Sequence, residues 1–138
     1  MSPIIGSRAR EHLARSLHLL ESHKDRFLEG MEASLRAQEG GDESFGQSEV
    51  ATMMLTDLLL EQGRSLADRG ELRLARDALA QHRALDINGR HYSRFGDALV
   101  AVLRDSLGPI PAEVSSAWCD AFWAIVRAVL AQEERVTA

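Results

Sequence analysis

Proline is nearly absent from the body of this chain, and that absence constrains the fold more than any other sequence feature. The prolines are Pro3, Pro109 and Pro111, so none interrupts the chain between residues 4 and 108. A proline inside a helix removes a hydrogen bond and clashes with the preceding turn. Leucine, alanine, arginine and glutamate dominate and favour helix. Runs of alternating β-branched residues are absent. We therefore predict an all-α fold.

Apolar residues recur at helical spacing and predict the positions of the helices. The first predicted helix begins at residue 7. The second contains residues 27–35 and ends before Gly40. Further helices are predicted over residues 48–66, 71–83 and 90–107, and from residue 111 onward. In the third stretch we expect Val50, Met54, Leu58 and Leu59 to face inward. The apolar faces predicted for the other long stretches are Ala9, Leu13, Leu17 and Leu20; Phe27, Met31 and Leu35; Tyr92, Phe95, Gly96, Leu99 and Leu103; and Val114, Trp118, Ala121, Phe122, Ile125 and Val129. We predict a polar connection at residues 42–47, a turn at residues 68–70 and a break between helices at residues 108–111. With no internal repeat, residues 1–138 form one predicted domain.

Composition excludes several classes of function. The net charge is −5 and the arginines are scattered among acids, which argues against a nucleic-acid-binding protein. The single Cys119 allows no internal disulfide, and we expect an inert buried thiol there. No apolar run approaches the ~20 residues of a membrane helix. The apolar start is too short for a signal peptide. We expect a cytoplasmic protein without membrane partners.

Two segments in the second half carry a family pattern. His82 is followed by Ile87 five residues later and by Tyr92 ten residues later. The last predicted helix contains the pairs Ala117–Trp118 and Ala121–Phe122. In these spacings the chain resembles bacterial globins, in particular the globin domain of flavohaemoglobins. The resemblance is good over residues 70–134 and weak over residues 12–60. It implies a globin-like fold of about seven helices.

The same resemblance implies a haem b site with His82 as the proximal iron ligand. Leu79 and Ile87 would lie beside it. Tyr92 and Glu133 match a tyrosine and a glutamate that hydrogen-bond with the proximal histidine in the family. Such partners orient an imidazole and raise its basicity. From periodicity alone, Tyr92 is equally a core aromatic with a hydrated hydroxyl, and Glu133 is more simply a solvated acid near the C-terminus.

The distal side departs from the family. In the family, the second helix carries a Phe-Tyr pair, and the tyrosine hydroxyl hydrogen-bonds the bound gas. The corresponding residues of this chain are Met31 and Glu32. The resemblance assigns the haem-wedging phenylalanine to Phe45, and the rest of the distal wall to Val50, Met53 and Met54. These three side chains offer a gas ligand no hydrogen-bond donor. Nitric oxide dioxygenation, which depends in the family on the tyrosine and an attached reductase domain, is therefore not predicted.

The sequence thus favours a haem-binding globin that binds a diatomic gas such as O2 or supports redox chemistry at iron. No catalytic residue is predicted, and whether the protein is an enzyme stays open. The alternative is a haem-free globin-fold sensor or protein-interaction module, which the Met31–Glu32 replacement favours. An unrelated helical bundle is a third interpretation. The partners that the sequence leaves open are the gas, a second copy docked through the two C-terminal helices, and a separate reductase.

Overall fold

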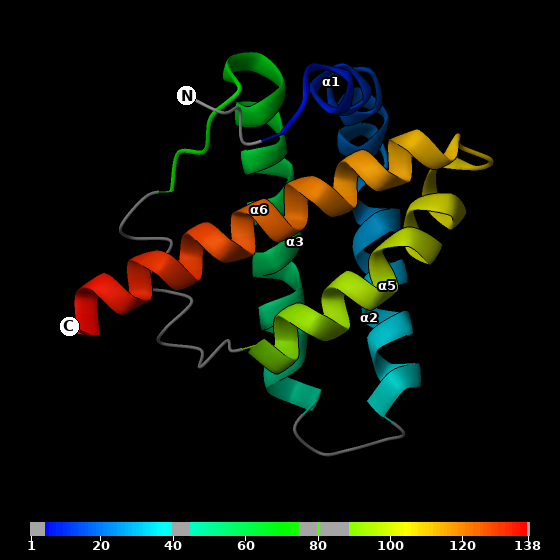
Figure 1. The fold of residues 1–138 in the computed structure, drawn as a ribbon. Coiled ribbons are helices and arrows are strands. Elements are labelled where there is room, and N and C mark those ends of the chain that lie inside the picture. Colours follow the sequence, from blue (N-terminus) through cyan, green and yellow to red (C-terminus); the bar gives the residue numbers. More distant parts are fainter. Residues whose placement is uncertain (1–4, 40–44, 75–79, 81–88, 138) are drawn as a thin grey trace.

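The described part of the chain is built from helices. A computed structural model describes residues 5–39, 45–74, 80 and 89–137, with the backbone alone at 36, 38, 39, 45–49, 89–91, 106, 107 and 132–137. These ranges contain no strand, which agrees with the all-α prediction. Their helices are α1 (Ser7–Ser22), α2 (Lys24–Glu39), α3 (Phe45–Arg69), α5 (Gly89–Leu107) and α6 (Ala112–Thr137) (Figure 1).

Helices α1 and α2 meet at a single residue, His23. Its N–H donates a hydrogen bond to the Leu19 carbonyl at 3.1 Å, and its own carbonyl accepts one from the Phe27 N–H at 2.9 Å. The chain therefore changes direction without leaving these backbone groups unpaired. The apolar faces predicted for both helices are confirmed, since they lie in the core: Leu13, Leu17, Leu20, Phe27, Met31 and Leu35.

The predicted break at residues 108–111 reverses the chain between the two long C-terminal helices. Helix α5 ends at Leu107 and α6 begins at Ala112, so the two run antiparallel (Figure 1). The Pro111 carbonyl accepts a hydrogen bond from the Val114 N–H at 3.0 Å and starts the new helix. Around this pair, α2 packs against α5, and α1 packs against both α3 and α6.

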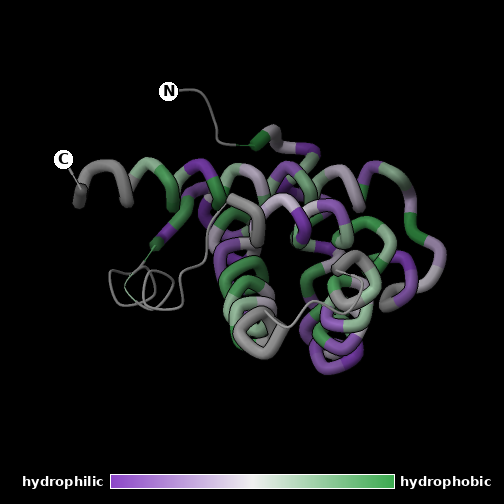
Figure 2. The backbone as a smooth tube through the Cα atoms, turned by 90° about the horizontal axis from the view of Figure 1, so that it is seen from below, coloured by the Kyte–Doolittle hydropathy of each residue, from purple (hydrophilic) through white to green (hydrophobic). Residues whose placement is uncertain are grey.

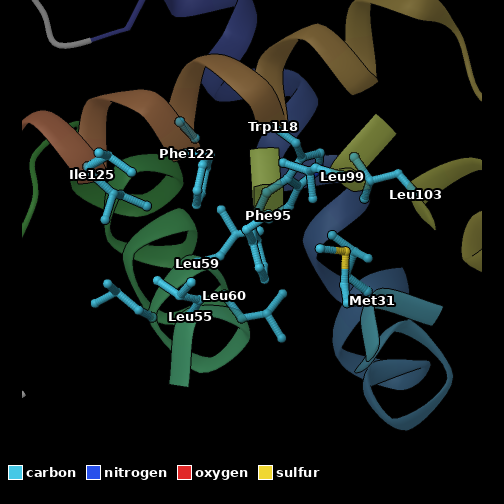
Figure 3. Close-up of a cluster of buried hydrophobic side chains, with 14 of the residues drawn as sticks. Met31, Leu55, Leu59, Leu60, Phe95, Leu99, Leu103, Trp118, Phe122 and Ile125 are labelled. Atoms are coloured by element: carbon cyan, nitrogen blue, oxygen red, sulfur yellow. The ribbon is translucent and has the colours of Figure 1, made fainter. Parts of the chain in front are cut away.

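One apolar core joins these helices. Figure 2, which looks along α2 and α3, gives the hydropathy of each residue along the chain. In the close-up of Figure 3, Leu59 from α3, Phe95 and Leu99 from α5, and Phe122 from α6 converge. The Phe95 and Phe122 rings stack with centroids 5.1 Å apart. Periodicity predicted the buried face of α6 correctly: Trp118, Ala121, Phe122, Ile125 and Val129.

Trp118 holds three helices together. Its indole N–H donates a buried hydrogen bond to Ser16 Oγ of α1 at 2.7 Å, across 102 residues of sequence. The Ser16 hydroxyl in turn donates to the His12 carbonyl at 2.7 Å. The far edge of the ring lies on α3 at Gly63, where an added Cβ would come within 2.7 Å of the ring carbon Cζ3. Glycine therefore allows α3 and α6 to cross closely.

The boundaries of α3 differ from the prediction. Phe45, predicted to lie in a polar connection, begins the helix, and the helix continues to Arg69 through the predicted turn. Glycine at position 46 and serine at position 48 disfavour helix locally. The tertiary contacts of the long apolar face that follows override this local preference.

One segment of α6 has the length and composition of a membrane span. Residues Ala112–Ala131 have a mean hydropathy of 1.3, although half of the segment is buried inside the protein. A helix that passes through the core of a folded domain has the same composition. The sequence shows no apolar run of that length, because charged residues interleave with apolar ones along this helix.

Removing the Ser16 hydroxyl tests the junction at Trp118. In Ser16→Ala the indole N–H stays buried without its acceptor, which costs about 1–3 kcal/mol. We expect the free energy of unfolding in urea to fall by that amount. Ser22→Ala is the matched control, because the Ser22 hydroxyl makes the same hydrogen bond to a carbonyl four residues earlier but is exposed. The control should change stability by less than about 0.5 kcal/mol. Equal stabilities of the two variants would contradict this role for Trp118.

Candidate functional site

Several residues of the predicted haem site lie outside what the structure describes. Leu79, His82 and Ile87 fall in residues 75–79 and 81–88, so the position of the predicted iron ligand is not described. Phe45 and Glu133 belong to α3 and α6 by their backbones, and nothing is described of their side chains. The described members of the predicted site are Val50, Met53, Met54 and Tyr92.

Tyr92 lies on α5 within the core. Its side chain is 1% exposed, and its hydroxyl oxygen is buried as well. The interpretation of Tyr92 as a core aromatic is therefore confirmed, and its hydroxyl lies away from bulk solvent. The hydroxyl lies inside the protein, where a tyrosine hydroxyl usually has a hydrogen-bonding role. The residue stands ten positions after His82, at the start of a helix whose next inward side chain is the fully buried Phe95.

The predicted distal residues lie on the side of α3 that faces away from the core. Val50 is 41% exposed and Met53 is 44% exposed, while Met54 is half-buried. The expectation that Val50 faces inward is wrong, because the neighbouring Ala51 and Leu55 take the inward positions. Sequence periodicity could not separate two apolar residues that stand side by side.

The outer face of α3 changes character along its length. We call the exposed residues Val50, Met53, Asp57, Glu61, Arg64 and Asp68 the α3 outer stripe. Its first two members are apolar and the others are charged. Asp57 forms an ion pair with Lys24, and Glu21 accepts a hydrogen bond from Arg64, which raises the pKa of that guanidinium. Only the N-terminal end of the stripe thus offers an apolar surface.

Met31 and Glu32, which the resemblance aligns with a Phe-Tyr pair, lie in different surroundings. Met31 is fully buried in the core, and Glu32 is half-buried on α2. Met31 therefore serves packing, which fits the flexible thioether side chain.

A side-chain amide holds the segment that follows α3. Gln62 is 2% exposed, its Nε2 donates to the Arg73 carbonyl at 2.7 Å, and its Oε1 accepts from the Arg73 N–H at 2.7 Å. Ser65 Oγ also donates to the Glu71 carbonyl at 2.6 Å. The predicted helix start at Glu71 is therefore wrong, because residues 71–74 are non-helical and pinned to α3. A long-range amide pairing of this kind gives no periodic signal.

Three pockets on the surface contain none of the predicted haem-site residues. One of about 220 Å³ lies at the end of α3, among Arg64, Arg69 and Arg73 together with acidic side chains. A second, of about 290 Å³, lies between Arg8 and His12 of α1 and the start of α6. The third, of about 250 Å³, adjoins Trp123. Their mixed charges and open shapes favour solvated surface depressions over a cofactor pocket.

Groups suited to metal chemistry are sparse in the described residues. Within residues 5–39, 45–74, 80 and 89–137, no three His, Cys, Asp or Glu side chains are grouped to hold a metal ion. A haem iron needs only one protein ligand, so this leaves the His82 prediction untouched. Burial raises the pKa of the half-buried Cys119 thiol, and the Asp120 carboxylate raises it further. At neutral pH the group is a thiol, as expected for an inert cysteine.

The Gln62 contact can be tested by hydrogen exchange. In Gln62→Leu, the Arg73 N–H and carbonyl lose their partner, and we expect the free energy of unfolding to fall by about 2 kcal/mol. Exchange of the Arg73 amide proton should accelerate at least about tenfold, since that proton is no longer held. Glu29→Leu, at an exposed position of α2, is the control and should change neither quantity. Unchanged exchange at Arg73 would show that the amide does not hold this segment.

Comparisons with known proteins assign no family to the chain. No protein-family model matches the sequence, and no curated protein matches it.

Proposed function

We propose that this protein is a haem-binding globin of the flavohaemoglobin type, with His82 as the proximal iron ligand. In this proposal the chain binds a diatomic gas or supports redox chemistry in the cytoplasm. Haem would supply the iron at which the gas binds or electrons are exchanged. The chain would supply the ligand, the polarity of the pocket and its access. Glu133 and the wedge Phe45 are part of the proposal on the strength of the sequence resemblance.

The observation that best supports this proposal is the apolar N-terminal end of the α3 outer stripe. Val50 and Met53 are each more than 40% exposed, although the rest of that stripe is charged. Two adjacent exposed apolar side chains at the position that the resemblance assigns to the distal wall fit a flat apolar group packed against them. Half-buried Met54 would line the same surface.

The buried hydroxyl of Tyr92 gives further support. If Tyr92 only filled the core, a phenylalanine would serve better, because burying a hydroxyl costs free energy unless it is hydrogen-bonded. In the proposal, Tyr92 orients the His82 imidazole and fixes which ring nitrogen carries the proton. The antiparallel α5 and α6 and the order of the helices also fit a globin.

A haem-free globin-fold sensor or interaction module is the second candidate. The observation that favours it is Met31, which is fully buried where the family carries the phenylalanine of its Phe-Tyr pair, followed by Glu32 in place of the tyrosine. Without that hydroxyl, one reason to retain haem is gone. The two candidates differ in a property that is simple to measure, the uptake of haem.

Absorption spectroscopy tests the proposal directly. The full chain is expressed with a haem precursor, and apoprotein is titrated with hemin. We expect a Soret band with one haem per chain, and we expect His82→Ala to abolish or shift it because iron loses its axial ligand. His91→Ala is the matched control, since that neighbouring imidazole is expected to point to solvent. A colourless protein that takes up no hemin would exclude the haem-binding function and leave the haem-free module or an unrelated helical bundle.

The distal wall gives a second expectation. Val50→Gln places an amide donor where the wild type has none. A hydrogen bond contributes about 1 kcal/mol, so O2 affinity should rise about fivefold. Affinity for CO, a poorer hydrogen-bond acceptor, should change less. Val50→Leu is the control that alters size without adding a donor. Equal O2 affinities in the two variants, measured by flash photolysis and stopped flow, would show that residue 50 is not in the distal wall.

A further inference from the structure

The outward face of α6 carries a regular series of exposed side chains. We call Ser116, Asp120, Trp123, Arg127 and Leu130 the α6 stripe; all five are exposed, and they are spaced alternately by four and three residues. Trp123 is 38% exposed and Leu130 is 39% exposed. This spacing keeps side chains on one line of a helix and is typical of the seam between two paired helices. These side chains lie away from the core-facing side of α6, and Ile5 and Gly6 of the N-terminal segment border the stripe beside Trp123.

The Trp123 ring packs against its own chain on one side and is exposed to solvent on the other. A Cβ added at Gly96 of α5 would lie 2.8 Å from the ring carbon Cζ2, so the indole packs directly against the backbone of α5. The ring of Phe122 also meets it edge-on, with centroids 5.2 Å apart. Trp123 is therefore held in one orientation before any partner arrives. A preorganised tryptophan is the residue type most enriched at the energetic centre of protein interfaces.

A depression lies directly beside this ring. It has a volume of about 250 Å³ and is lined by Ile5, Gly6, Asp120, Trp123 and Arg127. One face of the molecule thus carries both a partly exposed aromatic side chain and a hollow next to it. A two-fold interface needs such a surface, because the same patch must supply the protrusion and the hollow of both partners.

The charges select the orientation of the partner. Asp120 precedes Trp123 by three residues and Arg127 follows it by four. If a second α6 runs antiparallel across the first, Asp120 of each copy comes opposite Arg127 of the other. Leu130 then comes opposite Ser116, where a small side chain leaves room. A parallel arrangement would place carboxylate against carboxylate and guanidinium against guanidinium, which is unfavourable.

From this surface we infer that the chain forms a symmetric homodimer through antiparallel packing of the α6 stripe. Trp123 of each copy fills the hollow beside Trp123 of the other, and two Asp120–Arg127 pairs flank the two-fold axis. The dimer does not depend on haem, because the residues that form it lie on α6 and the N-terminal segment.

Charge exchange between copies tests the geometry. Asp120→Arg makes both flanking positions of a copy basic, and Arg127→Asp makes both acidic. Each variant alone should dimerise at least about tenfold more weakly than wild type, because like charges meet. Mixed in equal amounts, the two variants should form a one-to-one heterodimer, since every flanking pair is again of opposite charge. Sedimentation velocity of the full chain over a range of concentrations measures all three samples.

Trp123→Ala provides the independent measurement. Loss of a central aromatic anchor should raise the dimer dissociation constant about 30-fold or more. Leu19→Glu, at a leucine of α1 that is 43% exposed, is the control and should leave the constant unchanged. A wild-type chain that stays monomeric would overturn the inference, as would a dimer indifferent to Trp123→Ala or variants that fail to pair on mixing. Circular dichroism confirms that each variant is folded.

Discussion

The hydrogen bond from the Trp118 indole to Ser16 is the contact on which the arrangement of the helices depends. It joins residues 102 positions apart, and the same ring lies on the backbone of α3 at Gly63. Three helices that are distant in sequence therefore share one side chain. Because the indole can only donate, the position of the serine oxygen fixes how α1 lies relative to α6. The apolar core contributes most of the stabilising free energy, but it is less directional than this bond.

Much of the fold could be predicted because helical periodicity reports burial directly. The inward residues of α1, α2, α5 and α6 were predicted from spacing alone, and the break at Gly108–Pro111 follows from backbone chemistry. The errors occurred where a long-range contact decides. Residues 71–74 were predicted to begin a helix. They are non-helical, because the Gln62 amide and the Ser65 hydroxyl hydrogen-bond with the backbone of this segment. The side chain at Val50 faces outward, since Ala51 and Leu55 take the inward positions.

The candidate site was predictable to a smaller degree. Tyr92 could be identified as a buried aromatic from its spacing with Phe95, and the structure adds that its hydroxyl is buried too. The roles proposed for His82 and Glu133 rest on a family resemblance alone, because one imidazole or one carboxylate carries no periodic signal of its own. For the proposed distal wall, the structure adds a difference between the two ends of α3. The α3 outer stripe is apolar where the site is proposed and charged and ion-paired beyond it.

The two tryptophans of the chain occupy opposite environments on the same helix. Trp118 is completely buried, with its N–H bonded to Ser16, whereas Trp123 is 38% exposed on the outer face. Indole fluorescence shifts to longer wavelength as the ring meets water, so the emission contains one component from each environment. The blue component follows the integrity of the core, and the red component follows what covers the surface of α6. A single chain thus carries one optical reporter of its folding and another of the surroundings of its α6 surface, five residues apart.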